Sequence, residues 1–386
     1  MKIAIFTNNY LPNYFGVSTS IESFRLDFER MGHTVYVFAP QAVGYADANR
    51  NVFRYPSFDL NYKISFPLAI PYSWKIGNIL EKLEIDIIHS QHPNLLGYAA
   101  RRWAKKKKVP LVFTWHTLYD RYAHFVPPFI PRKLAAWWTI TNAVTYANRS
   151  DFVVTPTSSV EKIIKEWGVS NGNISSIPTG VDTEKFDRSD GNVIRKKYGI
   201  ADDKIVLTIV SRFTEEKNIG FLFGAVVPIL RKRKDVVFLA KGSGNLLPEM
   251  KEYVSGQGLE NRVIFAEEGD RKEDVFVAGD IFVYSSKSET QGMVIAEAMY
   301  CGLPVVAVRA TGVSDQVMDG ASGFLVSEDA DEFVRALEKI IDDEELRRRF
   351  SENAMKIARE NYTGDICAKN MLKLYEDAIS QKNNRI

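Results

Sequence analysis

The amino-acid sequence predicts an α/β fold made of two doubly wound domains in tandem, and three observations support this prediction. Short apolar runs, typical of buried strands, alternate with helical patterns through the first half of the chain. The same alternation restarts after the stretch 181–192, which is rich in Asp, Gly and Ser. The chain has 386 residues, more than one ordinary hydrophobic core accommodates.

The first half contains five apolar runs that we expect to be strands. A helix is expected between the first two runs, over residues 18–31, because Ile21, Phe24, Phe28 and Met31 recur at steps of three and four residues. Strands that are separated by helices pair in parallel, as in a doubly wound sheet. The expected strands are residues 3–7, 35–39, 85–89, 111–115 and 152–155.

The second half repeats this organisation. A helix is expected over residues 293–300, whose apolar side chains and alanines suit a helix, and the tail from about residue 330 is charged and helical in pattern. Sheets of this kind bind ligands at the carboxyl ends of their strands, so two that face each other would form an interdomain cleft. The expected strands are residues 205–210, 236–240, 263–266, 281–284 and 304–308.

Composition indicates a cytoplasmic globular protein. Hydrophobic residues make up 45% of the chain and charged residues 25%. No apolar run reaches the roughly 18 residues that a membrane-spanning helix needs, and the N-terminal segment is too short for a signal peptide. Cys301 and Cys367 are too few for a disulfide framework, and the five histidines lack metal-ligand spacing. We therefore expect no disulfide and no bound metal.

Charge is distributed unevenly along the chain. Residues 1–180 carry 20 Lys and Arg against 12 Asp and Glu, whereas residues 181–386 carry 30 against 36. A basic N-terminal half suggests an anionic surface as partner, either a membrane or a nucleic acid.

Two glutamates, Glu289 and Glu297, bracket the start of the helix expected at residues 293–300. The backbone N–H groups of Gln291, Gly292 and Met293 would lie at the N-terminus of that helix, where anionic or hydroxyl-rich ligands bind. Two carboxylates around free amides suit a sugar attached to a phosphate.

Two further motifs follow strands of the second half. Arg212 and Lys217, five residues apart, could converge on one diphosphate and stabilise it as a leaving group. Gly242 lies in the sequence Lys-Gly-Ser-Gly, where small residues let the backbone approach a phosphate or a base. A dinucleotide fingerprint is excluded because Leu247 stands where its last glycine is required.

In the first half, His116 stands at the carboxyl end of an expected strand. It could donate a hydrogen bond to a substrate hydroxyl, or act as an acid or base near neutral pH. Polar and aromatic residues follow it closely, namely Tyr119, Asp120, Tyr122 and His124.

Together these motifs resemble those of the group 1, family 4 glycosyltransferases, which are retaining enzymes of the GT-B fold, with two Rossmann-like domains facing a cleft. The resemblance implies an N-terminal acceptor-binding domain at residues 1–182 and a C-terminal domain for the nucleotide sugar at residues 193–364. The tail, at about residues 365–386, would cross back onto the N-terminal domain. The motifs that occur in the family's order are residues 15–16, His116-Thr117, residues 177–182, Arg212 with Lys217, residues 241–244, and Glu289 with Glu297.

The resemblance also implies a role for each residue. Glu297 would hold the ribose hydroxyls of the donor, Arg212 and Lys217 would bind its diphosphate, and His116 would contact the transferred sugar. Glu289 and the amides of Gln291, Gly292 and Met293 would contact the donor sugar, whereas Gly16 would let the first loop pass close to phosphate and acceptor.

The chain departs from the family pattern at three places. Phe15 stands where many members have glycine, and Thr179 stands where many have asparagine. Residues 267–269, Glu-Glu-Gly, replace the usual leucine-glycine in a stretch that tends to lie near the base, which leaves the donor nucleotide open.

Residues 116–125 resemble the branch of the family that glucosylates diacylglycerol. Two segments fit a protein that binds the surface of an anionic bilayer: a lysine run, and residues 125–138, which mix aromatic and cationic side chains. Alternatively, Trp137 and Trp138 pack inside the domain and the lysines form a solvated helix end. The run consists of Lys105, Lys106, Lys107 and Lys108.

The expected function is transfer of a hexose, glucose, from UDP-glucose to a membrane glycerolipid such as diacylglycerol, on the inner face of the membrane. We expect no cofactor besides the donor substrate and no nucleic-acid partner. No second carboxylate is placed like a glycosidase nucleophile, which favours a retaining front-face attack in which the leaving phosphate takes the acceptor proton. The alternatives are a soluble or polyprenyl-linked saccharide acceptor, a nucleotide-sugar epimerase, and a non-catalytic sensor of sugar nucleotides.

Overall fold

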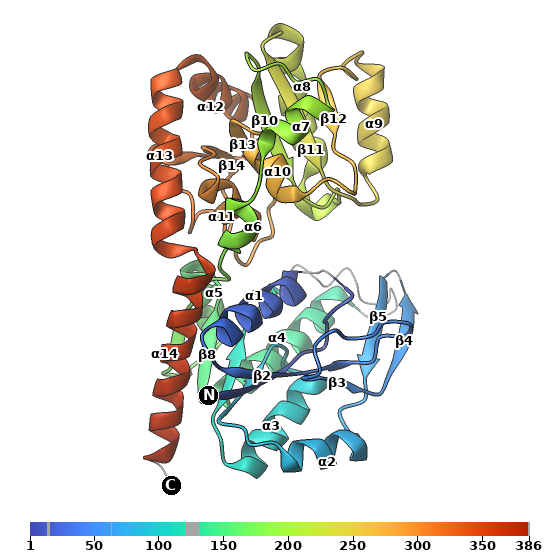
Figure 1. Ribbon diagram of the computed structural model, residues 1–386, viewed down its shortest axis with the longest axis vertical. Helices are drawn as coiled ribbons and strands as arrows, with labels where there is room; N and C mark the ends of the chain where they lie inside the picture. The colour runs from blue at the N-terminus through green and yellow to red at the C-terminus, as the bar shows by residue number, and fades with distance from the viewer. Residues whose placement is uncertain (14–15, 63, 120–130, 385–386) are drawn as a thin grey trace. The chain divides into compact units, whose positions relative to one another are not determined.

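The computed structural model describes the chain except for residues 14–15, 63, 120–130 and 385–386, and it divides into two compact units (Figure 1). Unit 1 comprises Met1–Gly180 and Gly364–Ile386, and unit 2 comprises Val181–Thr363. Unit 1 is therefore assembled from two separate segments of the chain, the second of which is the C-terminal helix.

Unit 1 is built around a seven-stranded parallel sheet in the order β3-β2-β1-β6-β7-β8-β9. The order reverses between β1 and β6, which is the point where doubly wound sheets bind ligands. An antiparallel hairpin, β4-β5, accompanies the sheet. The strands are β1 Lys2–Phe6, β2 Thr34–Pro40, β3 Val52–Tyr55, β4 Ser57–Tyr62, β5 Ile64–Ala69, β6 Ile87–Ser90, β7 Leu111–Thr114, β8 Phe152–Thr155 and β9 Ile174–Ser176.

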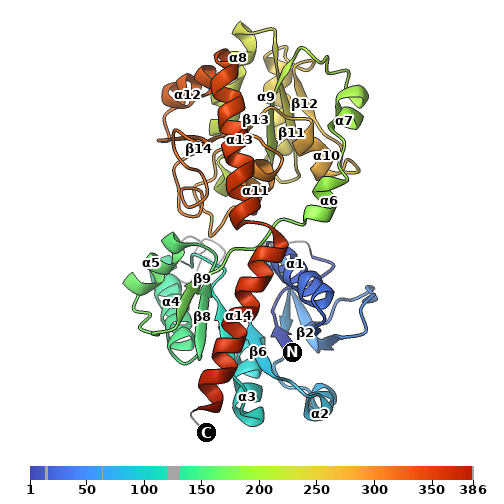
Figure 2. The same cartoon turned by 60° about the vertical axis from the view of Figure 1, so that its left-hand side comes forward.

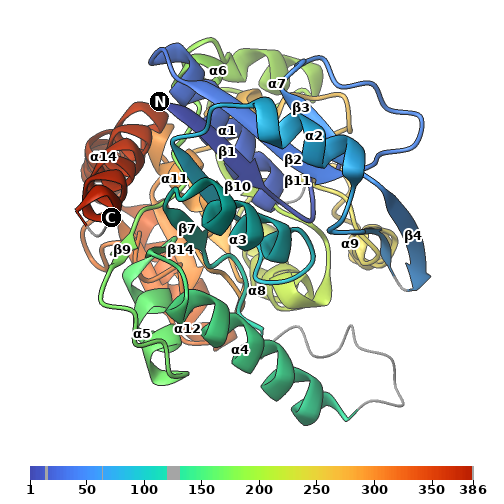
Figure 3. The ribbon, with the colours of Figure 1, turned by 90° about the horizontal axis from the view of Figure 1, so that it is seen from below.

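Helices cover both faces of this sheet because its strands are apolar on both faces. Alternate residues of β1 enter different cores: Ile3 and Ile5 pack with α1 and α14, whereas Ala4 and Phe6 pack with α2 to α5. Figures 2 and 3 show α14 on the same side of the sheet as α1. The helices are α1 Gly16–Arg30, α2 Trp74–Lys82, α3 Leu96–Lys107, α4 Arg132–Asn148, α5 Ser158–Glu166 and α14 Gly364–Asn383.

Unit 2 has a six-stranded parallel sheet in the order β12-β11-β10-β13-β14-β15, which reverses between β10 and β13. Leu207 and Ile209 of β10 face one core, and Val206 and Val210 face the other. The strands are β10 Ile205–Val210, β11 Val236–Lys241, β12 Val263–Phe265, β13 Ile281–Tyr284, β14 Val305–Val308 and β15 Gly323–Val326.

The helices of unit 2 flank this sheet (Figure 1). Residues 181–192, the stretch rich in Asp, Gly and Ser after which the alternation restarts, belong to this unit, and Val181 and Phe186 are buried in its core. The helices are α6 Thr183–Asp187, α7 Gly191–Lys197, η2 Glu215–Lys217, α8 Ile219–Lys232, α9 Leu247–Gly256, α10 Lys272–Val277, α11 Met293–Tyr300, α12 Ala330–Asp342 and α13 Glu344–Asn361.

The predicted α/β class with two doubly wound sheets is confirmed. Helix α1 begins at Gly16, two residues before the expected start at residue 18. Gly16 is thus the first residue of a helix and not part of a loop. A methyl group added to it would meet no atom within 4 Å.

Candidate active site

The reversal point of the unit 2 sheet brings together the segments that follow β10 and β13. Residues 211–218 follow β10, and residues 285–292 follow β13. The Ser285 hydroxyl donates to the carbonyl oxygen of Lys217 at 2.8 Å, which ties the two segments together. The predicted Lys217 and Glu289 therefore meet at the sheet edge where doubly wound folds bind ligands.

Lys217 and Glu289 form a buried ion pair, with side chains 13% and 11% exposed. The Tyr284 hydroxyl, at the end of β13, donates to the same carboxylate at 2.6 Å. Burial alone would raise the pKa of Glu289, but the charge of Lys217 and the hydrogen bonds from Lys217, Tyr284 and Ser286 outweigh it, so the pKa lies below its ordinary value. Burial and the Glu289 charge raise the pKa of Tyr284 well above its ordinary value. The site thus holds a fixed carboxylate, a cation and a neutral phenol.

Gly292 caps the N-terminus of α11 with a positive φ of 80°, a conformation that glycine adopts readily. The helix begins at Met293, as the sequence predicts. The amide group of Gln316 donates to the carbonyl oxygens of Gln291 and Gly292, the latter at 3.2 Å. Gln316 was not identified from the sequence, because no local pattern connects it with residues 289–293.

Arg212 lies at the same edge but is much more exposed. Its guanidinium pairs with Glu216 at 2.7 Å, and 49% of its side chain is accessible. Its charge also acts on Tyr284, whose pKa it lowers against the larger effect of burial. Arg212 and Lys217 therefore belong to one electrostatic environment, although each is paired with its own glutamate.

Glu297 lies one turn into α11 and has a different partner. Its Oε1 accepts from Lys272, at the start of α10, at 2.5 Å. Burial would lower the pKa of Lys272, but Glu297 raises it above the ordinary value. Glu297 Oε2 is buried without a hydrogen-bond partner among the residues that the structure describes. A buried carboxylate oxygen without a donor is costly and is a natural acceptor for a ligand hydroxyl.

Gly242 has a structural reason to be glycine. A methyl group there would lie 1.7 Å from the carbonyl oxygen of Ser211, so only glycine lets the segments after β10 and β11 approach this closely. The preceding Lys241 is held by the carbonyl oxygen of Glu267 at 2.7 Å. Gly242 therefore shapes this edge of the unit 2 sheet by allowing close contact with Ser211.

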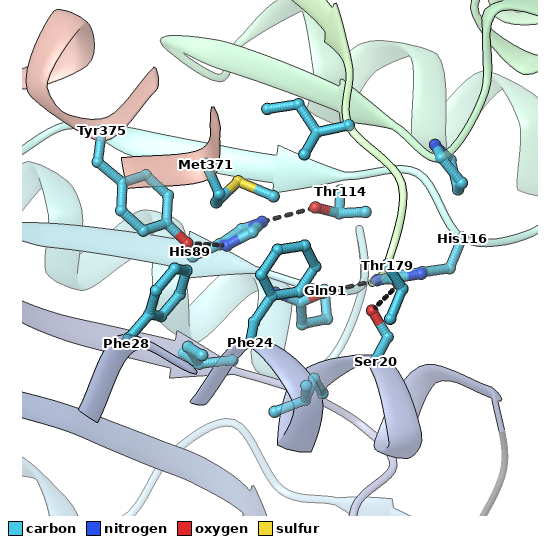
Figure 4. A pocket seen from close by; sticks show the side chains of 14 residues that line it. Ser20, Phe24, Phe28, His89, Gln91, Thr114, His116, Thr179, Met371 and Tyr375 are labelled. Carbon is cyan, nitrogen blue, oxygen red and sulfur yellow. Dashed lines mark hydrogen bonds between the residues drawn. The ribbon is translucent and has the colours of Figure 1, made fainter. Parts of the chain in front are cut away.

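In unit 1, His116 follows β7, and its Nε2 lies 2.6 Å from the Oε1 of Gln91, which follows β6 (Figure 4). Burial, together with the nearby His92 and His89, lowers the pKa of His116 to about 3. His116 is therefore neutral at physiological pH. It can exchange hydrogen bonds with a substrate hydroxyl, but it is a poor general acid there.

A pocket of about 370 Å³, counting its open mouth, lies beside His116 in unit 1 (Figure 4). His89 is one of the residues that line the pocket. Its Nδ1 lies 2.6 Å from the Tyr375 hydroxyl on α14, and its Nε2 lies 2.6 Å from the Thr114 hydroxyl on β7. Burial lowers the pKa of His89 to about 3, so it too is neutral. These contacts join the C-terminal helix to strand β7, which His116 follows.

Of the four polar and aromatic residues predicted after His116, Tyr119 lies among the described residues. Tyr119 packs edge-on against Trp115, with ring centroids 5.7 Å apart, and burial raises its pKa. Asp120, Tyr122 and His124 lie outside the described residues.

The lysine run lies at the end of α3, where basic side chains complement the helix dipole. Lys106 pairs with Glu81, and Lys107 donates to the carbonyl oxygen of Leu83 at 2.7 Å, so both also brace α2. On α4, Leu134, Trp137 and Trp138 are 54%, 62% and 59% exposed. The alternative that the two tryptophans pack inside the domain is therefore wrong.

No described helix is long and apolar enough to cross a membrane. No group of three or more His, Cys, Asp and Glu side chains in the described part of the chain is placed to hold a metal ion.

His116 belongs to unit 1, whereas Arg212, Lys217, Glu289 and Glu297 belong to unit 2. Each half of the predicted site is therefore described within its own unit.

Comparison with known proteins places the chain in a family. Residues 15–185 match the model of Glycosyltransferase Family 4, and residues 190–357 match that of Glycosyl transferases group 1. The alpha-monoglucosyldiacylglycerol synthase of Streptococcus pneumoniae is 28% identical over 396 residues, covering 99% of this chain and 87% of the relative. A D-inositol 3-phosphate glycosyltransferase of Stackebrandtia nassauensis is 30% identical over 311 residues, covering 77% of this chain and 69% of the relative.

Among solved structures, Anabaena HepE in complex with UDP and glucose has the same fold, with a TM-score of 0.76 and 20% identity, covering 98% of this chain and all of that one. The two family models together account for most of the sequence, and the relatives match both units. The chain belongs to the group 1, family 4 glycosyltransferases.

Proposed function

We propose that this glycosyltransferase moves glucose from UDP-glucose to the hydroxyl group of a membrane glycerolipid, diacylglycerol or its monoglucosylated form, with retention of the anomeric configuration. The observation that carries the proposal is the buried Lys217–Glu289 pair at the reversal point of the unit 2 sheet. The S. pneumoniae relative, whose name specifies a glucosyl group and diacylglycerol, supports the sugar and the acceptor.

When the donor binds, Lys217, Arg212 and Glu289 would exchange their present partners for groups of the donor. A diphosphate is a stronger ligand for Lys217 and Arg212 than the carboxylates that hold them now, because it carries more charge and more acceptor oxygens. Glu289, released from Lys217, would accept hydrogen bonds from the sugar hydroxyls. The unpartnered Oε2 of Glu297 would accept from a ribose hydroxyl, while Lys272 keeps the other oxygen in place.

The protonation states favour a reaction in which the leaving group acts as the base. In this step the bond from C1 of the sugar to the phosphate oxygen breaks and the bond from C1 to the acceptor oxygen forms on the same face. The acceptor proton passes to the phosphate oxygen that leaves. Glu289 is held by a cation, the pKa of Tyr284 is far above neutrality, and the pKa of His116 is about 3. None of the three is poised to exchange a proton near pH 7.

These properties also disfavour an epimerase, which needs an acid and a base in the same site. A carboxylate whose pKa is held low by Lys217 is a weak base. Lys217 would instead stabilise the charge that develops on the departing diphosphate.

The lipid acceptor is supported by the exposed aromatic residues of α4. Trp137 and Trp138 stand in the solvent beside Leu134 and Lys133, which is also exposed. Tryptophan with neighbouring cations suits the headgroup region of an anionic bilayer. We propose that α4 brings unit 1 onto the membrane surface where the lipid acceptor lies.

The test is an assay of the purified protein with UDP-glucose and diacylglycerol in anionic vesicles. We expect release of UDP, and a glucolipid whose anomeric proton shows the small coupling constant of an α-linkage. A donor panel with GDP- and ADP-glucose, and a parallel assay with soluble saccharide acceptors, identify the substrates. A β-linked product, or transfer only to a soluble acceptor, would overturn the corresponding part of the proposal.

A further inference from the structure

Gln316 lies beside the start of α11, in the segment that follows β14, and only 3% of its surface is exposed. Its Nε2 donates to three backbone carbonyl oxygens, those of Gln291, Gly292 at 3.2 Å and Gly312 at 3.1 Å. The amide can take only this orientation, because its oxygen cannot donate and would repel three carbonyl oxygens. One buried side chain thus holds two neighbouring peptide groups.

These contacts fix the direction of the N–H groups at the start of α11. In a trans peptide group, the C=O of one residue and the N–H of the next point in opposite directions. Because the carbonyl groups of Gln291 and Gly292 point toward Gln316, the N–H groups of Gly292 and Met293 point away from it. At this position the N–H groups carry the positive end of the helix dipole.

The segment that carries Gln316 is packed directly on the loop of Glu289. Gly312 has a positive φ of 77°, and a methyl group there would lie 2.9 Å from the carbonyl oxygen of Glu289 and 3.0 Å from the backbone nitrogen of Gln291. Gln316 and Gly312 therefore support residues 289–292 from the same side. The loop cannot rotate its peptide groups without breaking the contacts of Gln316.

We infer that Gln316 is a positioning residue for the nucleotide-sugar donor. It holds the peptide groups of residues 291–293 so that their N–H groups face the diphosphate sugar bound beside Glu289, and it does so without touching the donor. The inference rests on the proposed function, which places the donor at this edge of unit 2. It adds a residue from outside the sequence motifs to the donor site.

The test compares two variants with the wild-type protein. Gln316→Glu has nearly the same shape but presents carboxylate oxygens to the three carbonyl oxygens, and Gln316→Met fills the space without a donor or a charge. Gln257→Glu makes the same chemical change at the surface of unit 2, where the side chain accepts from Arg231, and serves as the matched control. The measurements are the Kd for UDP by calorimetry, the KM for each substrate, and amide hydrogen exchange over residues 289–295.

We expect the Kd for UDP and the KM for the donor to rise about tenfold or more in both Gln316 variants, while the KM for the acceptor stays within twofold of wild type. Hydrogen exchange should accelerate at residues 291–293, and Gln257→Glu should behave as wild type. If both Gln316 variants fold and bind UDP with the wild-type Kd, the inference is overturned and the proposed function stands. If the wild-type protein binds no nucleoside diphosphate, the proposed function falls and takes the inference with it.

Discussion

Removal of the Lys217 side chain is the perturbation whose effects the structure specifies best. The Lys217→Ala variant leaves Glu289, 11% exposed, in a buried position without its cation. Breaking a buried ion pair in this way costs about 3–5 kcal/mol. The hydrogen bond from Tyr284 at 2.6 Å remains. We therefore expect a loss near the lower limit, about 3 kcal/mol in the unfolding free energy of unit 2.

The effect on turnover follows from the charge of the leaving group. Loss of one positioned group that stabilises charge in a transition state lowers kcat by about 100- to 1,000-fold, or about 2.7–4 kcal/mol. We expect a decrease of this size in Lys217→Ala, with a smaller decrease in Lys217→Arg, which keeps the cation.

The pH dependence of stability gives the variant a distinctive signature. In the wild-type protein the pKa of Glu289 is lower in the folded state, so its stabilising contribution is present above the unfolded pKa and is lost as the pH falls through the folded one. In Lys217→Ala burial dominates and raises the folded pKa of Glu289. The carboxyl group then binds its proton more tightly in the folded state, and stability increases as the pH falls. The difference from wild type should therefore be larger at pH 8 than at pH 5.

The assay must report on unit 2. All six tryptophans lie in unit 1, so tryptophan fluorescence does not follow unit 2, and far-UV circular dichroism with hydrogen exchange over β13 and α11 is required. Lys204→Ala is the control, because Lys204 pairs with Asp203, whose side chain is 74% exposed, and such pairs contribute about 1 kcal/mol or less. Wild-type turnover in Lys217→Ala, or a stability loss that is the same at pH 5 and pH 8, would refute the reasoning.

Three further predictions concern other parts of the molecule. The pKa of His89 is about 3 in the folded state, so unfolded chains bind more protons than folded chains below about pH 6.5. His89→Gln should therefore reduce the acid destabilisation of unit 1 by about 1.4 kcal/mol per pH unit between pH 6 and 4, as measured in urea titrations. Replacement of Trp137 and Trp138 by serine should abolish co-sedimentation with anionic vesicles and leave the UDP affinity unchanged. Glu297→Gln should raise the donor KM about tenfold with little change in kcat, as measured in steady-state kinetics, because one charged hydrogen bond to a ribose hydroxyl is weakened.

The tryptophan and Glu297 predictions each have a control within the chain. Trp74→Ser, on α2, removes a tryptophan that is 85% exposed and should leave vesicle binding intact. Glu352→Gln alters a surface pair with Arg348 and should leave the donor KM unchanged. Equal loss of vesicle binding in the Trp74 variant would contradict the assignment to α4, and an unchanged donor KM in Glu297→Gln would contradict its ligand role. An unaltered pH slope in His89→Gln would show that this histidine is not protonated on unfolding.

Most of the strands that the sequence predicts are buried on both faces, because a continuous apolar run is a strong signal; the edge strand β12, Val-Ile-Phe, is predicted from its apolar run alone. The missed strands have weaker patterns, and in β3, Val-Phe-Arg-Tyr, an arginine interrupts the apolar residues. β9 has the sequence Ile-Ser-Ser at the sheet edge, and β15 begins with glycine. The hairpin β4-β5 lies outside the parallel sheet and contains Asp, Asn and Pro, which weaken a strand prediction. Pairing with a neighbouring strand, which only the folded chain supplies, determines these elements.

The same distinction applies to the site. Glu289, Lys217 and His116 could be found because each follows an apolar strand, and the carboxyl ends of such strands are where doubly wound folds bind ligands. Their partners could not be found in this way. Gln91 lies 25 residues from its partner His116 in the sequence, and Gln316 lies 25 residues from its partner Gln291. Tyr284, which donates to Glu289, has the sequence position of an ordinary last strand residue. Only the packing of the sheet edge brings these side chains to the motif residues.

The discontinuity of unit 1 has a consequence for how the protein is made. The ribosome synthesises all of unit 2 before it reaches α14. Until α14 emerges, Phe28 and its apolar neighbours in the nascent unit 1 lack the helix that covers them in the folded protein. Chains cut after residue 363 should therefore be captured by chaperones or form inclusion bodies, even though they contain every strand of both sheets. Adding a separate peptide with the sequence of α14 during refolding should restore solubility.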